Sequence, residues 1–147
     1  MTVERAPIVQ ERVLPAPPEV VFAAWSNPES LRIWMCPGEV ARAEVEMDFR
    51  VGGRFRIVMF GEREYAQHGE YLEIDPPKRL SFTWVSEWLP EDQAQTRVDV
   101  TLEPAGDGET RIRVVHEALP AGDSYDGHER GWADILRRLD EHLEGTP

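Results

Sequence analysis

The chain has 147 residues, with 28 acidic against 16 basic side chains and a formal net charge of −12. Nucleic acids and anionic membranes attract clusters of Lys and Arg, so this balance argues against both as partners. The N-terminal segment lacks the apolar run of a signal peptide, and no stretch reaches the length of a membrane span, so we expect a cytoplasmic protein. The length fits one domain spanning residues 1–147.

The N-terminal third predicts a strand followed by two short helices. Residues 8–14 alternate loosely in polarity, as a strand does. The proline-rich run 15–18 ends that strand and suits the first turn of a helix, which we expect over residues 19–25. Asn27 and Pro28 supply the cap and first turn of a second helix, which carries Leu31 and Trp34 and ends before Pro37.

From residue 39 the hydrophobic period changes to two, which predicts strands. The expected strands span residues 40–49, 54–60, 67–74, 79–84, 96–102 and 110–116. The turns between them, such as Asp75-Pro76-Pro77 and Gly106-Asp107-Gly108, are short. Successive strands should therefore pair antiparallel in one sheet.

The C-terminal segment predicts a long amphipathic helix. Its apolar residues recur at helical spacing, as Trp132, Ile135, Leu136, Leu139 and Leu143. Asp134 and Arg138 are spaced for an ion pair on the polar side, and Gly145 stands where a C-terminal cap belongs. The helix should cover one face of the sheet. Side chains alone rarely fill a sheet that curves around one helix, so we expect a cavity between them.

Short segments over nearly the whole chain carry a family resemblance: residues 17–25 (PPEVVFAAW), 28–34 (PESLRIW), 52–55 (GGRF), 69–77 (GEYLEIDPP), 80–84 (LSFTW), 110–111, 116–117 and 131–132. Together they resemble the START-like (SRPBCC) superfamily, and within it the homologues of the activator of heat-shock-protein ATPase. The resemblance implies an α+β helix-grip fold: a seven-stranded antiparallel sheet curved around a long C-terminal helix, with two short helices between strands 1 and 2. It also implies a deep hydrophobic cavity and no catalytic set. Many members read Trp-Trp-Gly-Pro where this chain has Trp34-Met35-Cys36-Pro37, so the cavity mouth should differ in shape.

Aromatic and Met side chains on the expected concave surface favour a ligand site. The candidate lining residues are Trp34, Phe55, Ile57, Met59, Phe82, Trp84 and Trp132. For any one of them taken alone, ordinary core packing is the better explanation, and only the set as a whole favours a ligand site.

Two polar residues are further candidates for the cavity. Glu70 shares strand parity with Leu72 and Ile74, which would point it into the apolar space, where burial raises a carboxyl pKa. Alternatively, the parity breaks near Gly69 and Glu70 is exposed. His116 faces the cavity by parity with its strand, or it is a hydrogen-bonded histidine at a strand end.

Metal, cofactor and nucleophile signatures are missing. Cys36 is the only cysteine, which rules out an intramolecular disulfide and a cysteine-rich zinc site, and a lone cysteine is usually a small buried hydrophobe. His68, His116, His128 and His142 show no metal-ligand spacing, and we expect the last two to be solvated. We therefore expect no metal and no cofactor.

These features favour a binding module for a small hydrophobic molecule, as a sensor, carrier or resistance protein. One alternative is an enzyme of cyclase or hydrolase type, which would need Glu70 and His116 as acid and base in the cavity. Another is a co-chaperone that stimulates a heat-shock ATPase, although the chain leaves no room for the additional N-terminal domain of such activators. Edge strands in an open sheet lead us to expect a homodimer.

Overall fold

The computed structural model describes residues 7–89, 95–117 and 123–144. In chain order its elements are β1 (Ile8–Leu14), α1 (Pro18–Ser26), α2 (Pro28–Trp34), β2 (Arg42–Met47), β3 (Arg54–Phe60), β4 (Glu64–Asp75), β5 (Arg79–Ser86), β6 (Gln95–Gly106), β7 (Glu109–Glu117) and α4 (Asp123–Glu144). This order confirms the predicted α+β helix-grip fold, with two short helices between the first two strands. No helix within the described ranges is long and apolar enough to cross a membrane.

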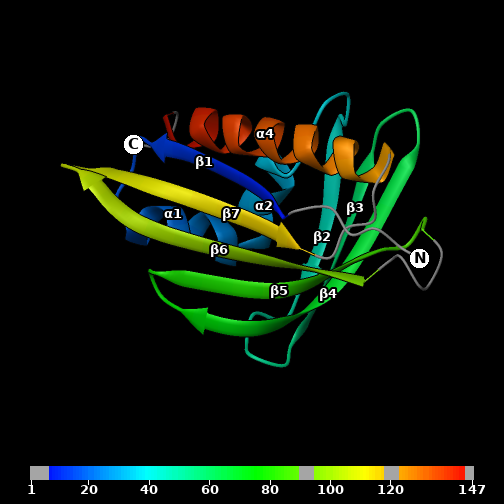
Figure 1. Ribbon diagram of the computed structural model, residues 1–147, viewed down its shortest axis with the longest axis horizontal. Coiled ribbons are helices and arrows are strands. Elements are labelled where there is room, and N and C mark those ends of the chain that lie inside the picture. The colour runs from blue at the N-terminus through cyan, green and yellow to red at the C-terminus, as the bar shows by residue number, and fades with distance from the viewer. Residues whose placement is uncertain (1–6, 90–94, 118–122, 145–147) are drawn as a thin grey trace.

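All seven strands form one antiparallel sheet in the order β1-β7-β6-β5-β4-β3-β2. Strands β2 to β7 follow one another as a meander, and β1 pairs with β7, with Ile8 opposite His116 and Leu14 opposite Thr110. In Figure 1, β2 and β3 stand steeply to β1, β6 and β7, so the sheet curves, and α4 runs alongside β1. The edges of the sheet are therefore β1 and β2.

The apolar stripe of α4 is buried as its spacing predicts. Trp132, Ile135, Leu136, Leu139 and Leu143 are each no more than 5% exposed. On the polar side, Arg12 of β1 donates from Nε to Oδ2 of Asp140 at 2.7 Å, which ties the helix to the edge strand. Helix and sheet thus share one core.

The two short helices begin where the sequence predicts. Pro17 and Pro18 open α1, and the Asn27 side chain accepts a hydrogen bond from the Glu29 amide at 2.9 Å to cap α2. Trp25 at the end of α1 packs edge-on against Trp34 of α2, with ring centroids 4.7 Å apart. This contact joins the two short helices.

The predicted pairing of Asp134 with Arg138 is wrong, because both side chains bind the backbone of Gly38 instead. Asp134 Oδ2 accepts from the Gly38 amide at 2.8 Å, and the Arg138 guanidinium donates to the Gly38 carbonyl at 3.1 Å. Gly38 has φ 58°, a left-handed conformation that glycine adopts without strain. The two bonds join the loop between α2 and β2 to α4. The predicted cap at Gly145 lies outside the described residues.

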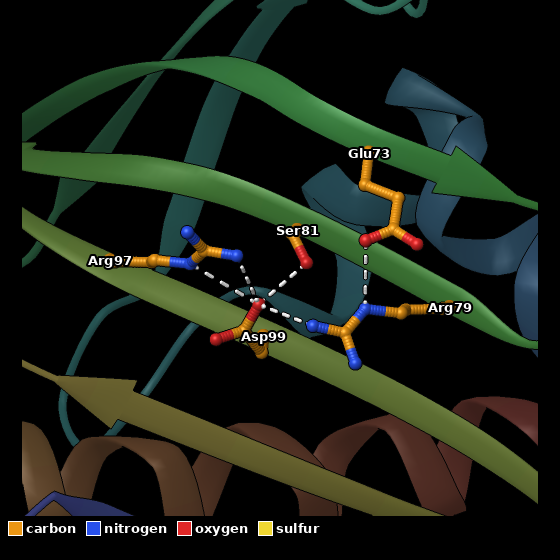
Figure 2. Close-up of polar contacts among 5 residues, drawn as sticks. All are labelled: Glu73, Arg79, Ser81, Arg97 and Asp99. Atoms are coloured by element: carbon orange, nitrogen blue, oxygen red, sulfur yellow. Dashed lines mark hydrogen bonds and ion pairs between the residues drawn. The ribbon is translucent and has the colours of Figure 1, made fainter.

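The outer face of β4, β5 and β6 carries a polar network (Figure 2). Asp99 accepts hydrogen bonds from Ser81, Arg79 and Arg97, and Arg79 also donates to Glu73 at 3.0 Å. Burial opposes the charged carboxylate, but these donors outweigh it and lower the pKa of Asp99. The network crosslinks three strands on the face opposite the core.

Candidate functional site

A pocket of about 700 Å³ opens between the inner face of the sheet, the loop after α2, and the N-terminal half of α4. It is lined by Pro37, Gly38, Glu39, Val40, Met59, Tyr65, Gln67, Trp84, Trp88, Leu89, His128, Arg130, Gly131, Trp132, Asp134 and Ile135. Most of these side chains are apolar or aromatic. The charged ones, Glu39, Arg130 and Asp134, come from the loop and from α4.

Three of the predicted lining residues lie on the wall of this pocket: Met59, Trp84 and Trp132. Met59 comes from β3, Trp84 from β5 and Trp132 from α4. The rings of Trp84 and Trp132 lie 5.7 Å apart, so sheet and helix meet at this point, as the amphipathic spacing of α4 predicts.

Phe55, Ile57 and Phe82 lie deeper, around a void of only about 20 Å³ that Trp84 also borders. Phe55 sits opposite Gly69 in the sheet, and a Cβ on that glycine would lie 2.7 Å from its ring. The ring thus takes the space that a larger residue at position 69 would need. These three residues form closely packed core rather than the wall of the large pocket.

Trp34 is also core. It is 0% exposed, and its Nε1–H donates to the Ser30 hydroxyl at 3.2 Å, within the same helix. Trp34 packs on Trp25 of α1, and it is not among the residues that line the large pocket.

Glu70 lies on the outer face of the sheet, so the expectation that it points into the cavity is wrong. In β4 the buried residues are Gln67, Gly69 and Tyr71, and Glu70 alternates with them. Its backbone amide donates to the Thr83 hydroxyl at 2.9 Å. Leu72, which shares strand parity with Glu70, is itself 37% exposed, and only Ile74, beyond the register shift between Tyr71 and Glu73, packs against the core.

His116 is fully buried, but Trp132 separates it from the pocket wall. The Trp132 indole donates to His116 Nδ1 at 2.9 Å, and His116 Nε2 lies 2.6 Å from the Thr96 hydroxyl. An indole can only donate, so Nδ1 is the acceptor and the neutral ring carries its proton on Nε2. The Thr96 hydroxyl in turn donates to the Trp84 carbonyl at 2.6 Å.

This chain of hydrogen bonds holds His116 in the neutral state. Burial lowers the pKa of His116 well below its usual value, and the neighbouring charge of His128 acts in the same direction. With both ring nitrogens engaged, His116 serves to position Trp132. Of the two alternatives considered for His116, the structure shows the second, a hydrogen-bonded histidine at a strand end.

Three ring side chains, Tyr65, Trp88 and His128, lie together on the lining of the pocket, and sequence patterns did not reveal this group. Trp88 packs edge-on against Tyr65 at 5.2 Å between centroids and lies nearly parallel to His128 at 6.2 Å. His128 and His142 are both half-buried rather than fully solvated, and His142 bonds the Ser30 hydroxyl at 3.1 Å. Trp88 follows the end of β5 and is 42% exposed, so no periodicity marks it.

Cys36 is buried and unsuited to chemistry at neutral pH. It is 3% exposed, and burial raises its thiol pKa. Across the part of the chain that the structure describes, no three His, Cys, Asp or Glu side chains gather where they could hold a metal ion.

A curved antiparallel sheet closed by a long C-terminal helix, with a largely apolar pocket between them, defines a START-like helix-grip protein. The sequence model of the family described as "Activator of Hsp90 ATPase homolog 1-like protein" matches residues 15–144. The chain belongs to this family.

Solved structures of similar proteins agree with that assignment. Protein CV1439 from Chromobacterium violaceum is 28% identical, with a TM-score of 0.82 over 96% of this chain and 99% of that one. Protein NE0264 from Nitrosomonas europaea is 26% identical, with a TM-score of 0.78 over 95% and 94%. PFC0360w, described as an HSP90 activator from Plasmodium falciparum, shares the fold at 23% identity and a TM-score of 0.76 over 97% and 99%. No protein curated for its function matches significantly.

Proposed function

We propose that this protein binds a small, largely apolar molecule in the pocket between the sheet and α4. The observation that carries the proposal is the pocket itself, with its volume of about 700 Å³ and its lining of aromatic and aliphatic side chains from three parts of the chain. Sites for small ligands typically measure roughly 300–1,000 Å³ and combine such a lining with a few polar groups.

The contrast between two parts of the interior supports this proposal. Around Phe55 and Phe82 the side chains leave about 20 Å³, whereas around Met59 and Trp132 they leave about 700 Å³. The larger space therefore lies beside the closely packed core, where the helix, the loop and the sheet meet.

A titration with Nile red, an uncharged apolar dye, tests the proposal. We expect one saturable site per chain, with a blue-shifted dye emission and quenching of tryptophan fluorescence. Ile33→Ala is the control for adsorption to the surface, because Ile33 is 61% exposed on α2 and is not part of the lining. Unsaturable binding, or binding that Ile33→Ala abolishes, would contradict the proposal.

Family membership favours a second candidate, stimulation of a heat-shock ATPase. The family is described by that activity, and one neighbour of the same fold is described as an HSP90 activator. A steady-state ATPase assay of the chaperone with and without this protein tests the candidate. Stimulation that saturates with added protein would support it, and an unchanged rate would remove it.

The enzymatic alternative required Glu70 and His116 to meet in the pocket as acid and base, and neither residue lines it. Glu70 lies on the outer face of the sheet, and His116 is enclosed between Thr96 and Trp132. An acid and a base on opposite faces cannot act on one substrate.

A further inference from the structure

Gln67 is a buried polar side chain on the inner face of β4, at the wall of the large pocket. It lies between Ile57 of β3 and Ser86 of β5, is 1% exposed, and belongs to the pocket lining. Its Nε2 donates to the backbone carbonyls of Ile57 at 2.9 Å and Tyr65 at 3.3 Å. A side-chain amide nitrogen carries two hydrogens, so both of its donors are used.

These two bonds fix the orientation of the amide. If the group were turned over, Oε1 would lie against two carbonyl oxygens, and acceptors do not bond one another. Oε1 therefore points away from the carbonyls of Ile57 and Tyr65. In this orientation the free end of Gln67 accepts a hydrogen bond and cannot donate one.

The oxygen of this amide is unpaired, and it is not enclosed by protein. No donor among the described residues bonds Gln67 Oε1. Within the same ranges, the enclosed side-chain atoms without a partner are Nε1 of Trp25, Nε1 of Trp84, the Ser86 hydroxyl and Nε of Arg138. Oε1 is not one of them, so it borders open space. The open space beside Gln67 is the pocket of about 700 Å³.

We propose that the ligand of this pocket is an uncharged, largely apolar molecule with a hydroxyl or N–H group that donates a hydrogen bond to Gln67 Oε1. This inference rests on the proposed function and adds a chemical class to it. A ligand that covers the oxygen without bonding it leaves a buried acceptor unpaired, which costs affinity. Gln67 shares the sheet wall with Met59 and Trp84, where an ammonium group without a counter-charge would be costly.

Water is the competing partner for this oxygen. A pocket of this size has room for water, and a water molecule can donate to Oε1. If such a water stays in place when a ligand enters, a donor on the ligand brings no gain in affinity. The two explanations therefore differ in how the affinity responds to a single N–H group.

The test compares carbazole with fluorene, two tricyclic molecules of nearly the same shape, of which only carbazole has an N–H donor. The affinity of each is measured by titration with the wild-type protein, Gln67→Met and Ser86→Ala. Met has nearly the length of Gln and lacks the amide oxygen. Ser86→Ala is the matched control, because Ser86 is a buried polar residue that pairs with Gln67 across the sheet but lines neither space.

We expect the ratio of the two affinities to shift against carbazole by about 3- to 10-fold in Gln67→Met and to stay at the wild-type value in Ser86→Ala. Because each ratio is taken within one protein, a general loss of stability in a variant does not imitate this result. An unchanged ratio in Gln67→Met, or an equal shift in Ser86→Ala, overturns the inference.

Nuclear magnetic resonance of ¹⁵N-labelled carbazole bound to the wild-type protein tests the same point without a variant. We expect a nuclear Overhauser effect between the carbazole N–H proton and the side-chain amide protons of Gln67. Effects from that proton to other lining residues, with none to Gln67, overturn the inference. If both probes bind but the N–H group has no effect, only this inference fails and the pocket remains a binding site. If neither probe binds the wild-type protein, the proposed function fails with it.

Discussion

At the scale of single residues, the buried polar side chain of His116 positions Trp132, which lines the apolar pocket. Its ring accepts from Trp132 and approaches Thr96, while His128 packs edge-on at 5.1 Å between centroids. A protonated His116 could no longer accept the indole hydrogen. The position of Trp132 at the pocket wall is therefore tied to the neutral state of this histidine.

This arrangement predicts a dependence of stability on pH. Because folding lowers the pKa of His116, the unfolded chain binds more protons once the pH falls below about 6.5, and the free energy of unfolding then decreases. Above that pH, His116 does not make the free energy of unfolding depend on pH. The loss from this one group is at most about 1.4 kcal/mol per pH unit. Urea denaturation at several pH values between 8 and 5, on wild type and His116→Gln, measures it.

The variant provides the comparison, because Gln can accept from Trp132 and donate to Thr96 without titrating. Glu87 does not interfere in this range. Hydrogen bonds from Arg56 and His68 lower the pKa of Glu87 to about 2, so its contribution is lost only below about pH 4.5. Equal slopes in wild type and His116→Gln between pH 6.5 and 5 would refute the role assigned to His116.

At the scale of elements, β3 passes from closely packed core to open pocket within two residues. Ile57 borders the 20 Å³ void and Met59 borders the 700 Å³ pocket, on the same face of the strand. The same substitution at the two positions should therefore have opposite consequences.

Ile57→Trp should destabilise the protein by about 1–3 kcal/mol, because the void cannot accept an indole. Met59→Trp should leave the melting temperature near that of wild type and weaken Nile red binding, because the new ring occupies the pocket. Thermal denaturation and dye titration of both variants check the pair. Equal destabilisation of the two variants would show that the space beside Met59 is not available.

The loop between α2 and β2 depends on α4 for its position. Asp134→Ala removes the acceptor of the Gly38 amide, and we expect faster hydrogen exchange at that amide and a few-fold weaker dye binding. Asp140→Ala is the matched control, since it breaks the bond to Arg12 on the same helix, away from the pocket. If the two variants change the exchange of Gly38 equally, the loop is not held by Asp134.

Local patterns predicted the elements well because each leaves a periodic signal. The strand over residues 8–14, the cap at Asn27 and the apolar stripe from Trp132 to Leu143 are all present in the structure. The site was predicted less completely, because the alternation of residues along a strand shows which face a side chain is on but not how far along the sheet the pocket extends. Phe55 and Met59 share a face, yet only Met59 reaches the large pocket.

Other parts of the site leave no periodic signal. The apolar residue Leu72 is exposed like its neighbour in parity Glu70, and Trp88, Leu89 and the loop at Gly38 lie outside regular elements. Their approach to the pocket depends on long-range packing against α4, which no local pattern encodes.

At the scale of the whole molecule, charge and sheet edges set the expected partners. With a net charge of −12, the protein should not retain duplex DNA or RNA in a gel shift at low salt, where electrostatic binding is strongest. Micromolar retention there would contradict this expectation. The homodimer expected from open edges stays a prediction, with β1 and β2 as the available edges.

The central claim, a ligand pocket between the sheet and α4, is tested most directly by the five tryptophan indole signals in a ¹H–¹⁵N correlation spectrum. Trp84, Trp88 and Trp132 line the pocket, whereas Trp25 and Trp34 do not. During a titration with fluorene, we expect the first three signals to move with one common dissociation constant, because the ligand's ring currents act at short range. Trp25 and Trp34 should move little. Five unchanged signals, or movement confined to Trp25 and Trp34, would contradict the claim.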